Sequence, residues 1–359
     1  NRNLIINGAM QVAQRGTSFA TMGNGDSQYT LDRFKWQEGG STTAEMTVTQ
    51  SSTSPNEFSK SLKVDVTTAD TTLGADDLIY IQYKNEGNVL GGIAKGTSDA
   101  KPLTLSFYVR SNTTGTFVVY LFDVDNTRSV SGTYTINAAD TWERKEVNFP
   151  ADTSGALTID NSHAMSINWV LGAGSNLKSS TLQTSWGSYD STALATGSTD
   201  ITGSTSNDWY ITGVQLEVGE QATPFEHRSF HDELRRCKRY FERFAKTLTG
   251  VGQASEANCG LWSGMSRSGN SGNNQGVMTY QTKRTNPSIS VSSAAHINGV
   301  FPISPFAASL SSFGIDGNAG IDNCFVNAAN NASSAPSSDC GSSGVMGNSS
   351  GTLDIDAEL

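Results

Sequence analysis

Apolar and polar residues alternate along many short segments of the chain. Residues 61–68, SLKVDVTT, place three aliphatic side chains on one face and polar side chains on the other. Residues 103–110, LTLSFYVR, repeat the pattern with Leu103, Leu105, Phe107 and Val109 as the apolar face. A period of two residues predicts strands with one buried face. About ten such segments precede residue 220, separated by turn signals at intervals of roughly 10 to 20 residues.

These segments predict an all-β fold over residues 1–228. Many short strands joined by turns are typical of an antiparallel jelly-roll β-sandwich of two sheets, and a barrel is the alternative. The first strand is expected at Leu4–Ile6, with a turn or bulge at Asn7-Gly8. Residues 175–206 are rich in Ser, Thr and Gly and are too long for a simple hairpin loop, so they predict a surface excursion.

The period changes after Phe230. Leu234, Cys237, Phe241 and Phe244 fall near helical spacing, which predicts a connecting amphipathic helix over residues 229–245. Residues 246–359 contain further strand patterns separated by Gly, Ser and Asn, and form the predicted C-terminal β domain. Because large apolar residues are sparse there, we expect this domain to gain order by oligomerisation.

Composition and charge limit the classes of function. The chain has 359 residues and a net charge of −10, which argues against a nucleic-acid partner because a phosphate backbone requires a basic surface. No apolar run approaches the roughly 20 residues of a membrane span, and no signal peptide pattern opens the chain. The cysteines Cys237, Cys259, Cys324 and Cys340 are irregularly spaced and are expected to be reduced, with a Cys324–Cys340 bridge as the alternative.

Metal and catalytic motifs are weak. His227 and His231 have the spacing H-x-x-x-H but lack the glutamate of a zinc protease motif, so helix capping and packing is preferred. Asp123, Asp125 and Asn126 could contribute to a calcium loop, yet the complete loop pattern is absent and a solvated turn is favoured. The nucleophile elbow of a serine hydrolase, a G-x-S-x-G motif between a strand and a helix, is not indicated. We therefore expect no catalytic residues, no metal and no cofactor.

Sugar binding has the best physical basis among the binding functions. Aromatic rings stack on the apolar faces of sugars, and amide or guanidinium groups bind the hydroxyls. Each aromatic residue could equally be a packing residue. The candidates on outward strand faces and in the long excursion are Tyr80, Gln82, Tyr108, Arg110, Trp186 and Tyr189.

The basic run after residue 230 is interleaved with aromatic residues. In an acidic chain, such a helix is better explained as a subunit interface whose basic face meets acidic neighbours than as a nucleic-acid site. The interface candidates are Arg235, Arg239, Tyr240, Phe241 and Phe244.

Several motifs resemble a known family. They are NLIINGAMQVAQRGTSF, YTLDRFKW, TLSFYVRS, DTWERKEVNFPADTSG, WYITGVQLEVGEQATPFEHRSFHDELRRCKRYFE, KRTNPSISV and DIDAEL, in that order over nearly the whole chain. Together they are similar to phage tail-fibre and virion structural proteins with a carbohydrate-binding-like jelly-roll domain. Secreted modules of this fold often bind a structural calcium, but Ala9 and Thr212 stand where their acidic ligands would be, which puts that site in doubt.

The resemblance implies a non-enzymatic virion protein of the tail or tail fibre that contacts host-surface glycans. It implies a homo-oligomer, most simply a homotrimer, bound to other tail proteins, assembled in the bacterial cytoplasm and released by lysis. The alternatives are a glycan-depolymerising tail spike, an accessory module of a secreted glycosidase, and a purely architectural head or tail component.

Overall fold

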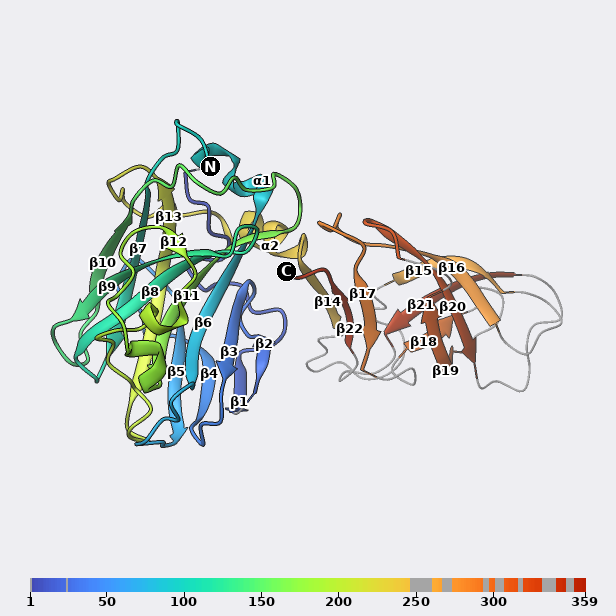
Figure 1. The fold of residues 1–359 in the computed structure, drawn as a ribbon. Coiled ribbons are helices and arrows are strands. Elements are labelled where there is room, and N and C mark those ends of the chain that lie inside the picture. The colour runs from blue at the N-terminus through green and yellow to red at the C-terminus, as the bar shows by residue number, and fades with distance from the viewer. Residues whose placement is uncertain are drawn as a thin grey trace. The chain divides into compact units, whose positions relative to one another are not determined.

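The chain forms two compact units, Asn1–Cys237 with Leu359, and Lys238–Glu358 (Figure 1). This computed structural model describes residues 2–23, 25–245, 260–266, 273–292, 297–300, 307–315, 319–330, 340–346 and 352–359. The predicted boundaries at residues 228 and 245 lie on either side of the division between the units. Within the described ranges, no helix is long and apolar enough to cross a membrane.

Two antiparallel sheets build the first unit. Sheet A has six strands in the order β1-β4-β5-β13-β7-β10, and sheet B has seven in the order β12-β9-β8-β11-β6-β3-β2. The strands of sheet A are β1 Ser18–Met22, β4 Glu45–Ser51, β5 Ser61–Thr68, β7 Leu103–Ser111, β10 Glu143–Phe149 and β13 Asp208–Val218. The strands of sheet B are β2 Ser27–Tyr29, β3 Phe34–Gly39, β6 Leu78–Glu86, β8 Gly115–Asp123, β9 Arg128–Ile136, β11 His163–Ala173 and β12 Gly187–Ser188.

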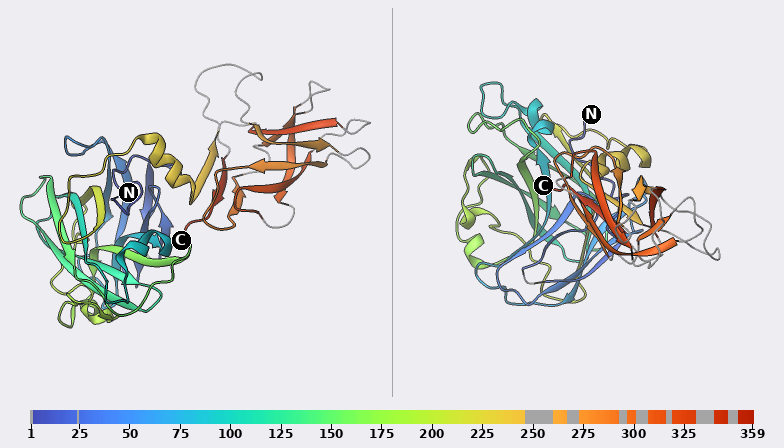
Figure 2. Two further views of the ribbon diagram at one scale, coloured as in Figure 1. Left: turned by 90° about the horizontal axis from the view of Figure 1, so that it is seen from above. Right: turned by 90° about the vertical axis from the view of Figure 1, so that its right-hand side faces the viewer.

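The two sheets face each other (Figure 2). Buried residues of both sheets form one core cluster between them. The predicted inward face of β7 is buried, with Leu105, Phe107 and Val109 at 0% exposure. Sheet B contributes Ile81 and Trp169, which are also fully buried. Burial of aliphatic and aromatic side chains from two facing layers stabilises a sandwich, so the predicted all-β jelly-roll class is confirmed.

The long excursion covers part of the outer face of sheet B. It carries two 3-10 helices, η2 Ser175–Lys178 and η3 Ser191–Ala193, and strand β12. Leu177 and Leu194 of this segment pack against Val118, Tyr120 and Val170 on that face. The predicted surface excursion is therefore a second apolar layer that leaves only part of the outer face of sheet B open.

The helices of the first unit are short, and the connecting helix is shorter than predicted. Besides η2 and η3, they are α1 Gly87–Leu90, η1 Gly91–Ile93 and α2 Phe230–Lys238, whose last residue begins the second unit. The prediction of a helix to residue 245 was wrong, because Phe241–Ala245 forms strand β14 instead. This strand pairs with β22. Arg243 forms a bidentate ion pair with Asp354, in which Nε and Nη2 donate to the two carboxylate oxygens at 2.7 and 2.6 Å. The spacing of Cys237, Phe241 and Phe244 is a local pattern, so it could not reveal that this segment pairs with β22, far along the chain.

The second unit contains a three-stranded sheet, β14-β22-β17, and a closed barrel, β15-β16-β20-β19-β18-β21. Lys283 is 1% exposed there, and its ammonium lies 3.0 Å from the Glu242 carboxylate. Cys324 is buried and forms no disulfide, so the alternative Cys324–Cys340 bridge does not form. The remaining strands are β15 Gly260–Ser266, β16 Asn273–Thr279, β17 Ser288–Val291, β18 Ile297–Val300, β19 Ala307–Ile315, β20 Asn323–Asn330, β21 Cys340–Met346 and β22 Thr352–Asp356.

The aromatic interface candidates are largely used within the chain. Tyr240 is 1% exposed and Phe241 is 2% exposed, so their assignment to a subunit interface is corrected. Phe244 is partly buried against the apolar cluster of the second unit. The side chain of Arg235 is 63% exposed, and Arg239 is partly buried. Of this set, Arg235 is the residue that a neighbouring subunit could reach most readily.

Candidate functional site

An open groove of about 300 Å³ lies on the outer face of sheet B, beside the excursion. Strands β6, β8 and β11 supply its floor, and the excursion supplies one wall. The lining residues are Tyr80, Gln82, Lys84, Tyr120, Phe122, Val124, His163, Ser166, Asn168 and Tyr189. Three of the predicted sugar-binding candidates, Tyr80, Gln82 and Tyr189, therefore meet in one place.

Strand register explains why these side chains share a surface. Asn168 of β11 pairs with Gln82 of β6 on one side and with Tyr120 of β8 on the other. Directly paired residues of neighbouring strands project from the same face of a sheet. A row of amide and phenol groups therefore crosses the three strands, and the next row contains Ser166 and Phe122.

A chain of hydrogen bonds holds the amides of the floor. Gln82 Nε2 donates to Asn168 Oδ1 at 2.9 Å, and Asn168 Nδ2 donates to Ser166 Oγ at 3.1 Å. Asn168 and Ser166 are each 1% exposed, so this network is shielded from water. No donor among the described residues reaches Gln82 Oε1, which leaves an oriented acceptor for a ligand hydroxyl.

Aromatic rings form the apolar part of the groove. The Tyr80 and Tyr120 ring centroids lie 6.3 Å apart, and Tyr189 meets Phe122 edge-on at 5.1 Å. Tyr189 is 38% exposed, which leaves part of its ring open to a ligand. Burial raises the pKa of Tyr80 to about 12, and the nearby Tyr189 adds to the shift. The Tyr80 phenol is protonated at neutral pH, as tyrosine ordinarily is, and can donate a hydrogen bond.

Backbone pairing fixes the wall residue Tyr189. Its N–H donates to the carbonyl oxygen of Thr127 at 2.9 Å. Just before it, Gly187 and Ser188 of β12 pair with Ser129 and Arg128 of β9. The wall is thus attached to the turn between β8 and β9.

The other candidates lie elsewhere. Tyr108 and Arg110 are on the outer face of sheet A, where Arg110 pairs with Asp140 at 2.7 Å and covers the Tyr210 ring at 4.9 Å. Tyr108 packs against the Phe58 ring at 5.4 Å. The structure therefore places both in packing contacts on the opposite side of the sandwich.

Trp186 also lies outside the groove lining. Its indole N–H donates to the Pro150 carbonyl oxygen at 2.9 Å, and its ring packs partly against the core. The ammonium of Lys95 lies 4.9 Å from its ring centroid. Trp186 thus supports the segment that carries Tyr189 without belonging to the groove.

Sequence reasoning missed the centre of the floor, Tyr120, Ser166 and Asn168. Each lies in a central strand that is apolar on both faces, so periodicity alone does not say which polar residue faces outward. An asparagine inside the apolar run SINWV was the available signal, because a polar group in a central strand requires a partner.

Several residues that the sequence analysis weighed as metal ligands make other contacts. Asp123 is fully buried and binds Lys95 at 2.5 Å, so the favoured solvated turn is wrong for this residue. The ring of His227 packs on Phe225 at 4.9 Å, and Thr212 donates its hydroxyl to the Lys60 carbonyl oxygen at 2.8 Å. In the described part of the chain, no group of three or more His, Cys, Asp or Glu side chains is arranged to hold a metal ion.

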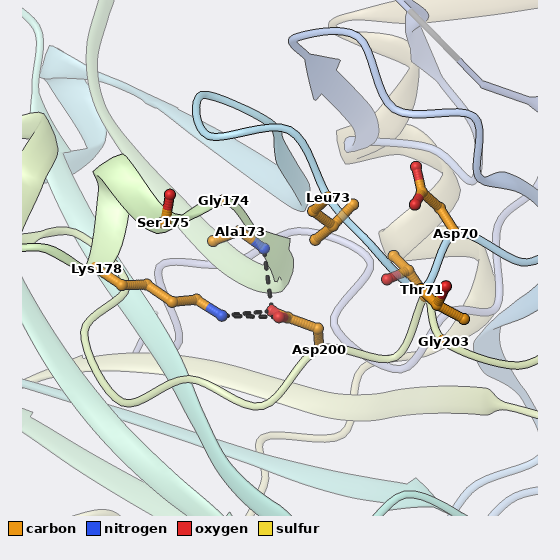
Figure 3. Close-up of a pocket in the computed structure, with 10 residues that line it drawn as sticks. Asp70, Thr71, Leu73, Ala173, Gly174, Ser175, Lys178, Asp200 and Gly203 are labelled. Carbon is orange, nitrogen blue, oxygen red and sulfur yellow. Dashed lines mark hydrogen bonds and ion pairs between the residues drawn. The ribbon is translucent and has the colours of Figure 1, made fainter.

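A second pocket, of about 350 Å³, lies between the loops near Asp70 and Asp200 (Figure 3). Lys178 points at Asp200 and binds both of its carboxylate oxygens, at 2.9 and 2.8 Å. Asp200 also accepts the Ala173 N–H at 3.0 Å. No aromatic residue lines this pocket, so it lacks the stacking surface of the groove.

Comparisons with known proteins give only distant similarities. No protein-family model and no curated protein matches the chain. The enzymatically active domain of tailspike protein 4 of bacteriophage CBA120 is 13% identical, with a TM-score of 0.32 over 60% of this chain and 21% of that one. The matched region thus spans about a fifth of that domain.

Two carbohydrate-binding modules are similar over most of their own length. The family 11 module from Clostridium thermocellum, in complex with a mixed-linked tetrasaccharide, is 14% identical, with a TM-score of 0.28 over 59% of this chain and 99% of that one. A xylan-binding domain of module family 22 is 14% identical, with a TM-score of 0.30 over 58% and 98%. At these identities and TM-scores, the similarities do not identify a function for this chain.

Proposed function

We propose that the first unit binds carbohydrate in the groove on the outer face of sheet B. The observation that carries this proposal is the meeting of Tyr80, Gln82 and Tyr189 over the amide floor of Asn168. A sugar offers an apolar ring face and a rim of hydroxyls, which matches exposed aromatic surface beside oriented amide and phenol groups. The groove is open, so it suits a few residues of a surface polysaccharide better than an enclosed small molecule.

The groove is better suited to binding than to cleavage. Its lining residues include no aspartate or glutamate, whereas most glycosidases need a pair of carboxyl groups beside the scissile bond. The basic groups Lys84 and His163 do not supply that pair. This supports a non-enzymatic role for the groove.

The biological setting that we propose comes from the sequence motifs. Their resemblance to phage tail-fibre and virion structural proteins favours a tail or tail-fibre component that attaches the virion to host-surface glycans. In this proposal the chain is a homo-oligomer, most simply a trimer, joined to other tail proteins, assembled in the host cytoplasm and released by lysis. A purely architectural head or tail component remains the alternative.

Binding to an array of bacterial surface polysaccharides tests the proposal. Tyr189→Ala should weaken binding roughly tenfold, because it removes a stacking contact of about 1–2 kcal/mol. Gln82→Leu should weaken it similarly by removing the oriented acceptor. Tyr108→Ala, on the outer face of sheet A, is the matched control and should bind as the wild type does.

Three results would contradict the proposal. Equal loss of binding in Tyr108→Ala and Tyr189→Ala would remove the groove as the site. Release of new reducing ends during incubation would instead favour a depolymerising tail spike. Absence of binding to any polysaccharide would favour the architectural alternative.

A further inference from the structure

The ammonium group of Lys95 is enclosed by oxygen atoms inside the first unit. Its side chain is only 3% exposed. The carboxylates of Asp123 and Asp152 lie 2.5 and 2.9 Å from Nζ. The carbonyl oxygens of Ser154 and Gly155 accept hydrogen bonds from it at 3.2 and 2.8 Å. A single positive charge therefore sits in a cage of two carboxylates and two carbonyls.

The two carboxylates have partners that hold them in place independently of Lys95. Arg128 donates to both oxygens of Asp152, each at 2.9 Å, and the Ser154 N–H donates to it at 3.0 Å. Burial opposes ionisation of Asp152, but the hydrogen bonds from Arg128 and Lys95 hold its pKa below the usual value. Asp123 Oδ1 accepts the Asn126 N–H at 3.1 Å. These hydrogen bonds from Arg128, Ser154 and Asn126 do not involve Lys95, so they can hold the two carboxylates in position without the lysine.

Two carboxylates with nearby carbonyls are the ligand chemistry of a hard cation such as calcium. We propose that the Lys95 ammonium serves as a built-in cation in this cage, where it replaces a bound metal ion and fixes the wall of the groove. The part of this inference that concerns the groove rests on the proposed carbohydrate-binding function. The part that concerns the cage does not.

The cage is connected to the groove through three segments. Asp123 ends β8 directly after the groove residue Phe122. Arg128, which binds Asp152, pairs with Ser188, the residue before Tyr189. Trp186 lies over the ammonium at 4.9 Å. Lys95 is therefore a positioning residue, because it contacts the supports of Tyr189 and does not line the groove.

Replacement of Lys95 by alanine should convert the cage into a metal site. Lys95→Ala removes the ammonium and leaves the buried Asp123 carboxylate without its cationic partner, whereas Asp152 keeps Arg128, so a bound cation would restore the balance of charge in the cage. We expect terbium(III), excited through tryptophan, to luminesce with Lys95→Ala and not with the wild type, and calcium to displace it. Adding Trp186→Phe to Lys95→Ala should remove most of the signal, because the sensitising ring adjoins the cage.

Lys178→Ala is the matched control. Lys178 also pairs with an aspartate, Asp200, but it is more exposed, at 22%, and faces a single carboxylate. That variant should show no tryptophan-sensitised terbium signal. Equal signals from Lys95→Ala and Lys178→Ala, or none from a folded Lys95→Ala, would overturn the cage assignment.

If Lys95→Ala does not fold without a cation, a refolding experiment with added cations tests the cage instead. Recovery of the native circular dichroism spectrum in millimolar calcium or methylammonium, but not in an equal concentration of tetramethylammonium, would support the cage. Failure of calcium and methylammonium to restore folding would overturn it.

Polysaccharide affinity tests the link to the groove. We expect Lys95→Ala to bind the polysaccharide at least tenfold more weakly without calcium and to recover with calcium, whereas Tyr189→Ala should not recover. If calcium occupies the cage of Lys95→Ala without restoring affinity, the positioning role is wrong. If the wild type binds no polysaccharide, the proposed function fails, while the terbium result still decides the cage.

Discussion

Glu38 of β3 is the most unusual single residue of the sandwich. It is 3% exposed, and neither carboxylate oxygen has a hydrogen-bond partner among the described residues. Burial raises its pKa from 4.5 to about 7, and the nearby Asp26 and Asp77 carboxylates add to the shift. A buried carboxylate without a partner is costly when ionised. The folded state therefore favours the protonated form of Glu38.

This shift predicts a stability that falls as the pH rises. Because the folded pKa lies above the unfolded value of 4.5, the stabilisation is fully present below pH 4.5 and is lost as the pH rises through about 7. The loss is on the order of 3 kcal/mol at most. Glu38→Gln should remove this component, measured as the free energy of unfolding in urea from pH 4.5 to 8. The exposed control Glu220→Gln should keep the wild-type pH profile.

At the scale of elements, the N-terminal segment does not form the strand that its apolar residues predict. Residues 3–12 were expected to contain a strand, but no strand forms there. The side chain of Asn7 forms hydrogen bonds in place of backbone pairing between strands. Its Nδ2 donates to the carbonyl oxygens of Val12 and Asp32, and its Oδ1 accepts the Val12 N–H, each at 2.9 Å. Asn7 has φ 61°, a conformation that asparagine tolerates better than most residues. One buried asparagine thus organises the segment.

Asn7→Ala should destabilise the first unit by about 2–4 kcal/mol, because it removes three buried hydrogen bonds and retains a positive φ. The measurement is chemical unfolding followed by tryptophan fluorescence. Asn56→Ala, at an exposed position without comparable bonds, is the control and should change stability by less than about 0.5 kcal/mol. Equal stability of the two variants would show that Asn7 is not the organising residue.

At the scale of the whole molecule, the first unit has one large cluster of buried residues from both sheets. The proposed oligomer rests on the sequence, in which large apolar residues are sparse over residues 246–359. Exposed Arg235 is the polar contact candidate for that oligomer.

The oligomer predicts a molar mass of about three times the chain mass of 38.1 kDa by light scattering. If the basic face of α2 meets acidic neighbours, Arg235→Glu should shift the protein toward the monomer, with a larger effect at low salt. Lys101→Glu, an exposed charge reversal away from α2, should leave the molar mass unchanged. A monomeric wild type would contradict the predicted trimer.

The sequence by itself determined the class of fold and the faces of single strands. Alternation in residues 61–68 and 103–110 depends on the two-residue period of a strand, which is local, and the buried residues follow it. The same period placed Tyr80 and Gln82 together on one face of β6, where the structure has them. Spacing alone could not separate helix from strand at Phe241 and Phe244, because a short apolar pattern fits both.

The tertiary structure decided which faces meet, because strand register and long-range pairing join residues far apart in the sequence. It brought Asn168 between Gln82 and Tyr120, and it separated Tyr108 and Arg110 from them by assigning their strand to the other sheet. It also placed Lys95 against Asp123 and Asp152, in segments whose local patterns contain no sign of one another. The floor of the groove and the cation cage are both consequences of this pairing.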